Sequence, residues 1–553
     1  MKRIIIVITT CLAFASCNVL DTAFDINTTQ EQLDGQPSMV LKVGYAPYGY
    51  MVSGFSDFDN NLGSARCDEA VATSRSASVR YFNNGSWNAY NNPDNRYANF
   101  YKGIRAANYY LEYSVEYKKM LAVARDTLSD NGTAYHLDVI NAGYLRAEAR
   151  VLKAYYYFEL LKRYGDVPLY KSVPADATFL PRTPYAEVVE YAIKEIDDAL
   201  PSLAPDWKSY ASFDGRFNKG AALALKSRIL LYAASPLNTE DMTDAERTAA
   251  WERAANAASD VIALGQYQLS DSYKNLFVGN TSSNKEIILS RRSSPSNNLE
   301  KANYPIATAG GNSGITPSGN LVDAYEYTGT PDPASPFAKR DPRLAFTIVT
   351  NGSTWNSRTI DISENGTDSY RNTNASRTGY YLKKYLTDDL VLTQSQTAMH
   401  HWVYFRYAEI LLNYAEAANE VWGPDVAGTC GLTAREALNM VRNRPSVALG
   451  DIDLSKFVGI DERTQMRAAV KAERRVELAF EDHRYWDLLR WKDGASLAET
   501  ITGIKASVNG DKIKYEKIDV EPRVFEENMY RYPLPHEEVS KAGGVLVQNE
   551  GWN

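Results

Sequence analysis

Cysteine and histidine are scarce in this chain. Its 553 residues include four Cys and five His, and none of them has the spacing of a zinc site or of a disulfide framework. His400 and His401 are adjacent, so both cannot face one site on a regular helix. The sequence therefore predicts no metal ion, and each histidine is expected at the surface or at the edge of the core.

Motifs of catalysis are also missing. The chain has no glycine-rich phosphate loop, and the segment Gly311-Asn312-Ser313-Gly314 lacks the partners that a serine protease would need. Residues 361–366 match the opening of a calcium loop, but Asn372 stands where a bidentate Glu is required. The 68 Asp and Glu residues leave a glycosidase acid pair open, because abundance excludes nothing. We predict no catalytic residue and no cofactor.

Basic residues are fewer than acidic residues in this chain. Lys and Arg number 60 against 68 Asp and Glu, and the formal net charge is −8, so the chain lacks the electrostatic footprint of a nucleic-acid-binding protein. The composition is otherwise that of a globular protein, with 44% hydrophobic and 23% charged residues, enough for one large or two smaller cores.

The N-terminus has the pattern of a lipoprotein signal. Lys2 and Arg3 precede an apolar run over residues 4–15, which suits a signal peptide and is too short to span a membrane. Ala15 and Ser16 stand before Cys17 as in a lipobox, although Phe14 occupies the place where Leu is usual. We predict a signal over residues 1–16, lipidation at Cys17 and a polar tether over residues 17–36. The alternative is a plain secretory signal with an incidental Cys.

The clearest helix lies between residues 144 and 164. Apolar residues recur every three to four positions along it, from Ala147 to Leu161, and basic residues occupy the other side. Gly165 suits a left-handed C-cap and Pro168 prevents resumption, so the helix is expected to end at about Tyr164. Its consecutive tyrosines, residues 155–157, are predicted to lie in a core.

Further helices are predicted on both sides of a long irregular stretch. Helices are expected to begin at about Pro37 and to alternate in hairpins, whose small residues permit close stacking as in tetratricopeptide repeats. Residues 270–400 are rich in Gly, Ser, Asn, Pro and Thr, so they are predicted to form an irregular, partly stranded subdomain. The segments expected to be helical are 100–120, 185–200, 219–234, 249–264, 404–421, 434–442 and 465–491; strands are expected at 286–290 and 344–349, and an extended tail from Pro522.

Aromatic residues are abundant: 38 Tyr, 17 Phe and 9 Trp. An aromatic ring can cover the C–H face of a sugar while neighbouring amides and guanidinium groups bind its hydroxyls. The alternative is that these rings fill the space between helices and that asparagines only mark turns. The candidates for ligand contact are Trp87, Tyr90, Arg292, Tyr304, Asn312 and Trp355.

Several motifs together resemble the SusD/RagB family of outer-membrane nutrient-binding lipoproteins. They are colinear and cover nearly the whole chain. The usual Asn-Pro near the C-terminus is replaced around Ala542-Gly543-Gly544. The motifs are Cys17 with Leu20-Asp21, Cys67-Asp68-Glu69-Ala70, residues 101–108, 146–169 and 316–325, Asp341-Pro342-Arg343, residues 406–412, 473–481 and 486–491, Tyr532-Pro533-Leu534-Pro535, and Gln548-Asn549-Glu550-Gly551.

This resemblance implies about four tetratricopeptide-like helix pairs carrying ligand-binding loops. It further implies a surface-exposed, lipid-anchored protein of the outer membrane that delivers oligosaccharides, or in some branches peptides, to a SusC-like TonB-dependent transporter. The expected division is an N-terminal helical region at 37–269, a loop-rich subdomain at 270–400 and a C-terminal helical region with its tail at 401–553. A lipid-anchored glycoside hydrolase and a protein-binding repeat scaffold remain alternatives of other classes.

Overall fold

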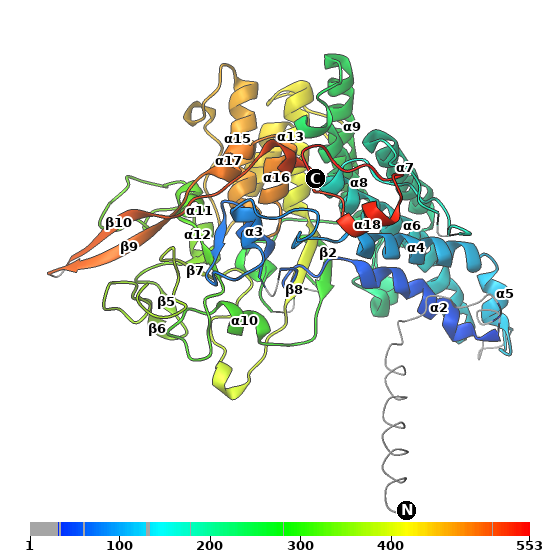
Figure 1. Cartoon of the computed structure of the whole chain (residues 1–553), viewed down its shortest axis with the longest axis horizontal. Coiled ribbons are helices and arrows are strands. Elements are labelled where there is room, and N and C mark those ends of the chain that lie inside the picture. The colour runs from blue at the N-terminus through cyan, green and yellow to red at the C-terminus, as the bar shows by residue number, and fades with distance from the viewer. Residues whose placement is uncertain are drawn as a thin grey trace, which may run out of the picture.

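The computed structural model describes residues 31, 35–58, 61–128, 133–176, 178–279, 281, 283–510 and 512–552. The predicted signal of residues 1–16, Cys17 and most of the predicted tether of residues 17–36 lie outside this part of the chain. Within it the protein is mainly helical, as predicted, and Figure 1 shows a layer of long helices beside a region of loops and short strands.

The long helices pack as successive pairs. Helix α6 lies against α4 and α7, α8 lies against α7 and α9, and α13 joins α9 to α14 and α15. Stacked helix pairs of this kind form a tetratricopeptide-like scaffold, so the predicted fold class is confirmed. The bounds are α2 (Pro37–Tyr45), α4 (Tyr97–Tyr113), α5 (Tyr117–Ala122), α6 (Thr133–Tyr164), α7 (Tyr185–Ala199), α8 (Lys219–Ala234), α9 (Asp244–Ala263), α13 (Tyr407–Trp422), α14 (Ala434–Arg442), α15 (Glu462–Glu477) and α16 (Arg484–Arg490).

Helix α6 is the central helix of this scaffold. It ends at Tyr164 as predicted, and Gly165 follows in the left-handed region with φ +72°. It begins at Thr133, before residue 144, where the predicted helix begins. On α4, Gly103 faces Tyr156 so closely that an added Cβ would lie 2.5 Å from the tyrosine ring. The absent side chain therefore lets α4 and α6 approach each other.

The rest of the chain is built from short elements. The described strands form five two-stranded antiparallel sheets, of which the β9–β10 hairpin projects from the body in Figure 1. The bounds are β1 (Ala70–Ala72), β2 (Ile287–Arg292), β3 (Ile315–Pro317), β4 (Ile348–Val349), β5 (Thr354–Trp355), β6 (Arg358–Thr359), β7 (Tyr381–Leu382), β8 (His401–Arg406), β9 (Ile501–Asn509) and β10 (Lys512–Glu521), with short helices α3 (Arg80–Asn83), α10 (Asn298–Asn303), α11 (Gly319–Ala324), α12 (Arg343–Thr347), α17 (Gly494–Ala498) and α18 (His536–Lys541).

Five predicted segments differ from the structure. The helix predicted over 100–120 is interrupted between α4 and α5, and the one predicted over 465–491 breaks between α15 and α16, where Phe480 and Asp482 adopt positive φ. The first residues of the helix predicted at 404–421 belong to strand β8, and most of the strand predicted at 344–349 is helix α12. The tail after Pro522 contains α18. In each case tertiary contacts override a local pattern.

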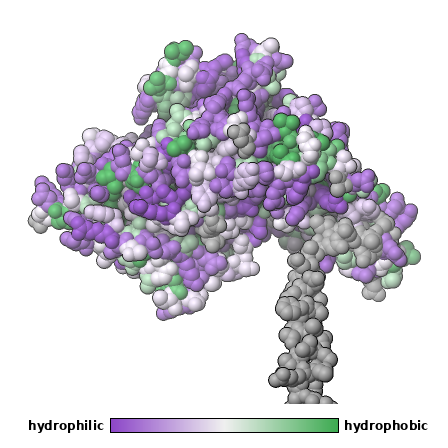
Figure 2. All heavy atoms as spheres, viewed as in Figure 1, coloured by the Kyte–Doolittle hydropathy of each residue, from purple (hydrophilic) through white to green (hydrophobic). Residues whose placement is uncertain are grey.

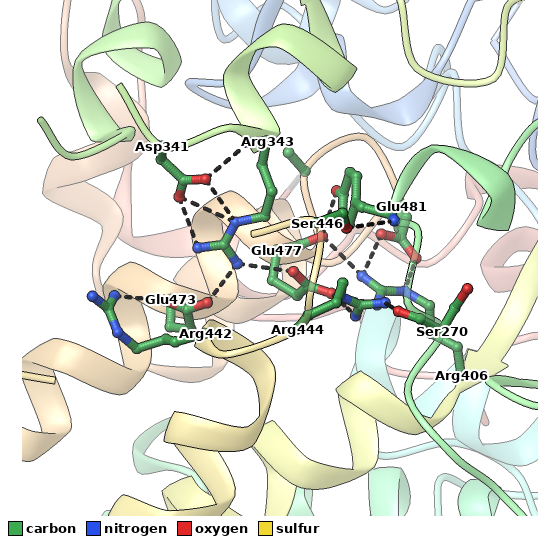
Figure 3. Close-up of polar contacts among 12 residues, drawn as sticks. Ser270, Asp341, Arg343, Arg406, Arg442, Arg444, Ser446, Glu473, Glu477 and Glu481 are labelled. Carbon is green, nitrogen blue, oxygen red and sulfur yellow. Dashed lines mark hydrogen bonds and ion pairs between the residues drawn. The ribbon is translucent and has the colours of Figure 1, made fainter. Parts of the chain in front are cut away.

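Glu477 lies at the centre of a buried charge cluster, shown in Figure 3. Its carboxylate oxygens lie 2.8 Å from Arg343 Nη1, 2.7 Å from Arg406 Nη1 and 2.8 Å from Arg444 Nη2. All four side chains are at most 1% exposed. Burial alone would raise the pKa of Glu477, but the three guanidinium groups outweigh burial and hold that pKa well below its usual value.

The buried charge cluster connects the helical scaffold to the loop-rich region. Its members are Glu286, Asp341, Arg343, Arg406, Arg444, Glu473, Glu477 and Glu481. Glu477 comes from α15, Arg406 from the end of β8 and Arg343 from the start of α12. Because one carboxylate binds guanidinium groups from separate segments, the two parts of the molecule are fixed against each other.

None of the helices in the described part of the chain has both the length and the apolar composition needed to cross a bilayer.

Candidate functional site

Trp87, a predicted ligand contact, lies in an aromatic core. Only 2% of the residue is exposed, and its ring centroid lies 4.7 Å from Phe82, 4.9 Å from Tyr532 and 4.7 Å from Trp552. The ring therefore offers no face to a ligand, and the packing alternative accounts for it. The partners Tyr532 and Trp552 come from the C-terminal tail, so this tryptophan ties the tail to the N-terminal half.

Tyr90, three residues later, is the opposite case. It is 71% exposed, and its ring stacks on His536 with centroids 4.2 Å apart and an interplanar angle of 27°. His536 N–H also donates to Ala89 O at 3.0 Å. The tyrosine ring is thus held in place on one face and open to solvent on the other.

The different burial of Trp87 and Tyr90 predicts different effects of their removal on stability. Trp87→Ala should lower the free energy of unfolding by about 3–5 kcal/mol, because it removes a large ring from a packed core. Tyr90→Ala should change it by less than about 0.5 kcal/mol, because most of that ring is in water. Urea denaturation of both variants checks the pair. Equal losses of stability would contradict the assignment of the two rings to different roles.

Tyr304 and Trp355 are brought together, but inside the protein. They are 0% and 1% exposed, and their rings meet edge to face with centroids 5.2 Å apart. The Tyr304 hydroxyl donates to Thr387 O, and burial raises the pKa of this phenol to about 12. The prediction of two ligand-binding rings in this region is corrected, because both rings pack against each other in the core.

Arg292 and Asn312 are accessible but lie in different surroundings. Arg292, at the end of β2, pairs with Asp214 across 2.6 Å at a half-exposed position. Asn312 is exposed, and its Oδ1 accepts a hydrogen bond of 3.2 Å from Asn374 Nδ2. Of the six predicted ligand residues, Tyr90, Arg292 and Asn312 thus present polar or aromatic groups to solvent.

Asn312 belongs to a surface formed by four segments, residues 73–81, 84–92, 308–313 and 370–377, which we call the loop surface. Antiparallel pairing of β1 with β3 brings the first and third segments together, and it continues where Thr73 N–H donates to Gly314 O at 2.9 Å. The Asn312–Asn374 bond joins the third segment to the fourth. Ser86 N–H donates to Tyr81 O at 3.1 Å and joins the second segment to the first.

Glu521 links two segments of the loop surface through ion pairs. Its Oε2 accepts from Arg80 Nη1 and from Arg377 Nη1, both at 2.8 Å, so one carboxylate holds the first segment to the fourth. Burial would raise the pKa of Glu521, but Arg523, Arg80 and Arg377 outweigh it and lower that pKa. The carboxylate therefore stays ionised and keeps both arginines in position.

The exposed groups of the loop surface suit the recognition of hydroxyl-rich ligands. Tyr81 is 42% exposed and Tyr370 is 45% exposed, which adds two partly open rings to that of Tyr90. Arg75 is exposed and makes no ion pair or hydrogen bond within the described residues. The face of the molecule drawn in Figure 2 is mostly hydrophilic, with hydrophobic residues in small groups. Rings, amides and a guanidinium group can bind sugars without transforming them.

Sequence reasoning missed part of this surface. Arg75 and Asn374 stand in Ser- and Asn-rich runs that indicate turns and nothing more specific. One further signal is that Ser313 and Asn374 adopt positive φ, 48° and 60°, on neighbouring segments. Non-glycine residues in this region often mark loops whose shape is imposed by their surroundings.

One acidic residue whose pKa is raised, Glu69, lies in the core. Burial raises the pKa of Glu69 to about 8, which would suit a general acid, but the residue is 1% exposed and no substrate reaches it. Among the described residues, no group of three or more His, Cys, Asp or Glu side chains could hold a metal ion. Cys67 and Cys430 are both free thiols.

Comparison with known proteins agrees with this architecture. A family model described as "SusD family" matches residues 285–552, and one described as "Starch-binding associating with outer membrane" matches residues 52–231. A curated relative, SusD-like protein P38 of Formosa agariphila, is 26% identical over 377 residues, which are 65% of this chain and 68% of that protein.

Two crystal structures from Bacteroides fragilis are similar over nearly their whole length. A SusD-like protein shares 26% identity and a TM-score of 0.76, covering 94% of this chain and 98% of that one. A protein described as a SusD-like carbohydrate binding protein shares 24% identity and a TM-score of 0.71, covering 93% and 99%. The second likeness bears on the fold alone.

Proposed function

Because the chain belongs to the SusD/RagB family, we propose that it captures oligosaccharides at the cell surface and delivers them to a SusC-like TonB-dependent transporter. The observation that carries the proposal is the loop surface, where exposed tyrosine rings, amides and an arginine without an ion pair among the described residues stand on four linked segments. One of the two matching family models is described as "Starch-binding associating with outer membrane".

The physical basis of capture is an open, multi-contact surface. An oligosaccharide can lie across exposed rings while its hydroxyls replace water at Asn312, Asn374 and Arg75. The bonds through Glu521 and Asn312 fix the segments before the ligand arrives, so little ordering of loops is needed on binding. A surface that binds without a cleft releases its ligand readily, which suits transfer to a transporter.

A glycan array probed with the detergent-solubilised full chain tests this proposal. We expect binding of at least one class of oligosaccharide and no release of reducing sugar on prolonged incubation. Binding confined to a peptide library would favour the peptide-capturing branch of the family. Release of reducing ends would move the protein to the glycoside hydrolases.

Surface display is proposed to depend on lipid at Cys17. Each buried methylene of an acyl chain contributes about 0.8 kcal/mol to membrane binding. Cys17→Ala should therefore abolish palmitate labelling and shift the protein from the membrane fraction to the supernatant after fractionation. Cys67→Ala is the matched control, and it should leave the labelling unchanged. Retention of Cys17→Ala in the membrane fraction would contradict the lipid anchor.

A further inference from the structure

A hollow separate from the loop surface opens on the helical scaffold. It encloses about 430 Å³ between α9, α13, α15 and the residue that follows α16. Two tryptophans line it, Trp251 from α9 and Trp491 after α16. We call it the tryptophan groove. Figure 1 shows α9, α13, α15 and α16 in the upper part of the molecule.

The two tryptophans are held differently. Trp491 is 7% exposed, and its Nε1–H donates to Glu416 Oε1 at 2.7 Å. It therefore forms a fixed wall. Trp251 packs against the core from a partly exposed position, so its ring keeps an open side toward the groove. A hollow of this size with such a ring accepts one or two sugar residues.

The acidic groups that line the tryptophan groove are already engaged. Glu420 binds Arg467 through two contacts of 2.6 Å, from Nε and from Nη2. Glu416 binds Arg490 in the same two-pronged manner, also at 2.6 Å. The third, Glu240, pairs with Lys492. Each of these carboxylates therefore already has a cationic partner in direct contact.

Lys471 is the basic residue of the tryptophan groove that forms no ion pair within the described residues. Its Nζ lies 4.6 Å from the centroid of the Trp491 ring, and it makes no ion pair or hydrogen bond with any residue in the part of the chain that the structure describes. Burial lowers the pKa of this ammonium group. Glu416 and Asp493 attract this ammonium group without forming an ion pair with it, and burial outweighs them. A half-buried ammonium in this position gains from a carboxylate or sulfate placed beside it.

We infer that the tryptophan groove is a second saccharide site, selective for sugar residues that carry an anionic group. The sugar ring lies against Trp251, and its carboxylate or sulfate ester pairs with Lys471. This inference rests on the proposed function for its ligand class, since saccharides are what the protein is proposed to capture. It adds a preference for anionic sugars at a place separate from the loop surface, where Arg75 is an exposed cation.

The test compares an acidic saccharide with its neutral ester and with a sulfated saccharide. Tetragalacturonate and its fully methyl-esterified form are titrated into the detergent-solubilised full chain by calorimetry, with a sulfated galactotetraose as a third probe. We expect tetragalacturonate to bind at least tenfold more tightly than the ester. Tight binding of the sulfated probe instead assigns the groove to sulfate esters. Equal affinity of all three probes would overturn the inference.

Variants test whether the preference for acidic saccharides arises in the tryptophan groove. Lys471→Gln should remove the preference for the acidic probe, Lys471→Arg should restore most of it, and Trp251→Ala should weaken both charged and neutral probes. Lys194→Gln, on the exposed side of α7, is the matched control and should change nothing. An acidic preference that survives in Lys471→Gln would contradict the assignment.

The experiments can contradict the loop surface and the tryptophan groove independently of each other. If neutral oligosaccharides bind and depend on Tyr90 while tetragalacturonate shows no dependence on Lys471, the second site is wrong and the proposed function stands. If tetragalacturonate depends on Lys471 while no saccharide depends on the loop surface, the groove stands and the loop surface is not the capture site.

Discussion

Glu477→Gln should lower the free energy of unfolding by about 3–5 kcal/mol, the range for removing one partner of a buried ion pair. Three fully buried guanidinium groups, those of Arg343, Arg406 and Arg444, share this carboxylate. The neutral amide fits the same space but leaves these positive charges without part of their compensation. Urea denaturation followed by circular dichroism measures the loss.

The matched control is Glu190→Gln. Glu190 also pairs with an arginine, Arg253, at 2.7 Å, but both side chains are about half exposed. Exposed pairs contribute less than about 1 kcal/mol, so this variant should be nearly as stable as the parent. If the two variants lose the same small amount, the buried charge cluster does not hold the two parts of the molecule together.

The same cluster predicts how stability depends on pH. The folded protein holds the pKa of Glu477 below that of the unfolded chain, so the folded state keeps this carboxylate ionised while the unfolded state takes up a proton. The contribution to stability is therefore present above pH about 4.3, the usual Glu value. It is lost as the pH falls from there toward the folded pKa. Unfolding free energies of Glu477→Gln should depend less steeply on pH in this acidic range.

Tyr90→Ala should reduce affinity for a captured oligosaccharide at least tenfold, which corresponds to about 1.4 kcal/mol. The ring is fixed by His536 and open on its other face, so its removal deletes a preorganised contact without disturbing the core. Calorimetric titration with the best hit from the glycan array measures the change.

Asn312→Ala and Arg75→Ala should weaken binding less, by about threefold to tenfold each, since each removes hydrogen bonds that compete with water. Arg292→Ala is the control among the predicted residues, because its guanidinium group is paired with Asp214 and neither residue belongs to the four segments of the loop surface. Unchanged affinity in Tyr90→Ala, Asn312→Ala and Arg75→Ala would mean that the ligand binds elsewhere.

Local signals in the sequence predicted several elements to the residue. Helix α8 has the predicted bounds because Asn218 caps its start, accepting from Ala221 N–H, and Ser235-Pro236 ends it. Helix α6 stops at Gly165 for the same kind of reason. Such signals act within a few residues and are visible without the fold.

Other features depend on contacts between distant segments. The break between α15 and α16 has no Gly or Pro to announce it, and it places Glu481 in the buried charge cluster beside Arg406 and Lys384. Trp87 looked like a loop residue because its core partners, Tyr532 and Trp552, are more than 400 residues away in the chain. Burial that depends on such partners cannot be inferred from neighbouring residues alone.

The sequence therefore predicted the family and the fold more completely than it predicted the ligand-binding residues. The helical scaffold follows from periodicity, caps and motifs, and it is confirmed. Of the predicted ligand residues, Tyr90 and Asn312 lie on the loop surface, whereas Trp87, Tyr304 and Trp355 are in the core. An aromatic residue next to Asn and Ser has the same local pattern in both settings, so only the structure separates them.

Hydrogen–deuterium exchange with and without the best-binding oligosaccharide tests the central claim most directly. Capture by the loop surface predicts slower exchange in residues 73–81, 84–92, 308–313 and 370–377, with an intact saccharide recovered afterwards. Protection confined to other segments, or a cleaved saccharide, would contradict capture by this surface.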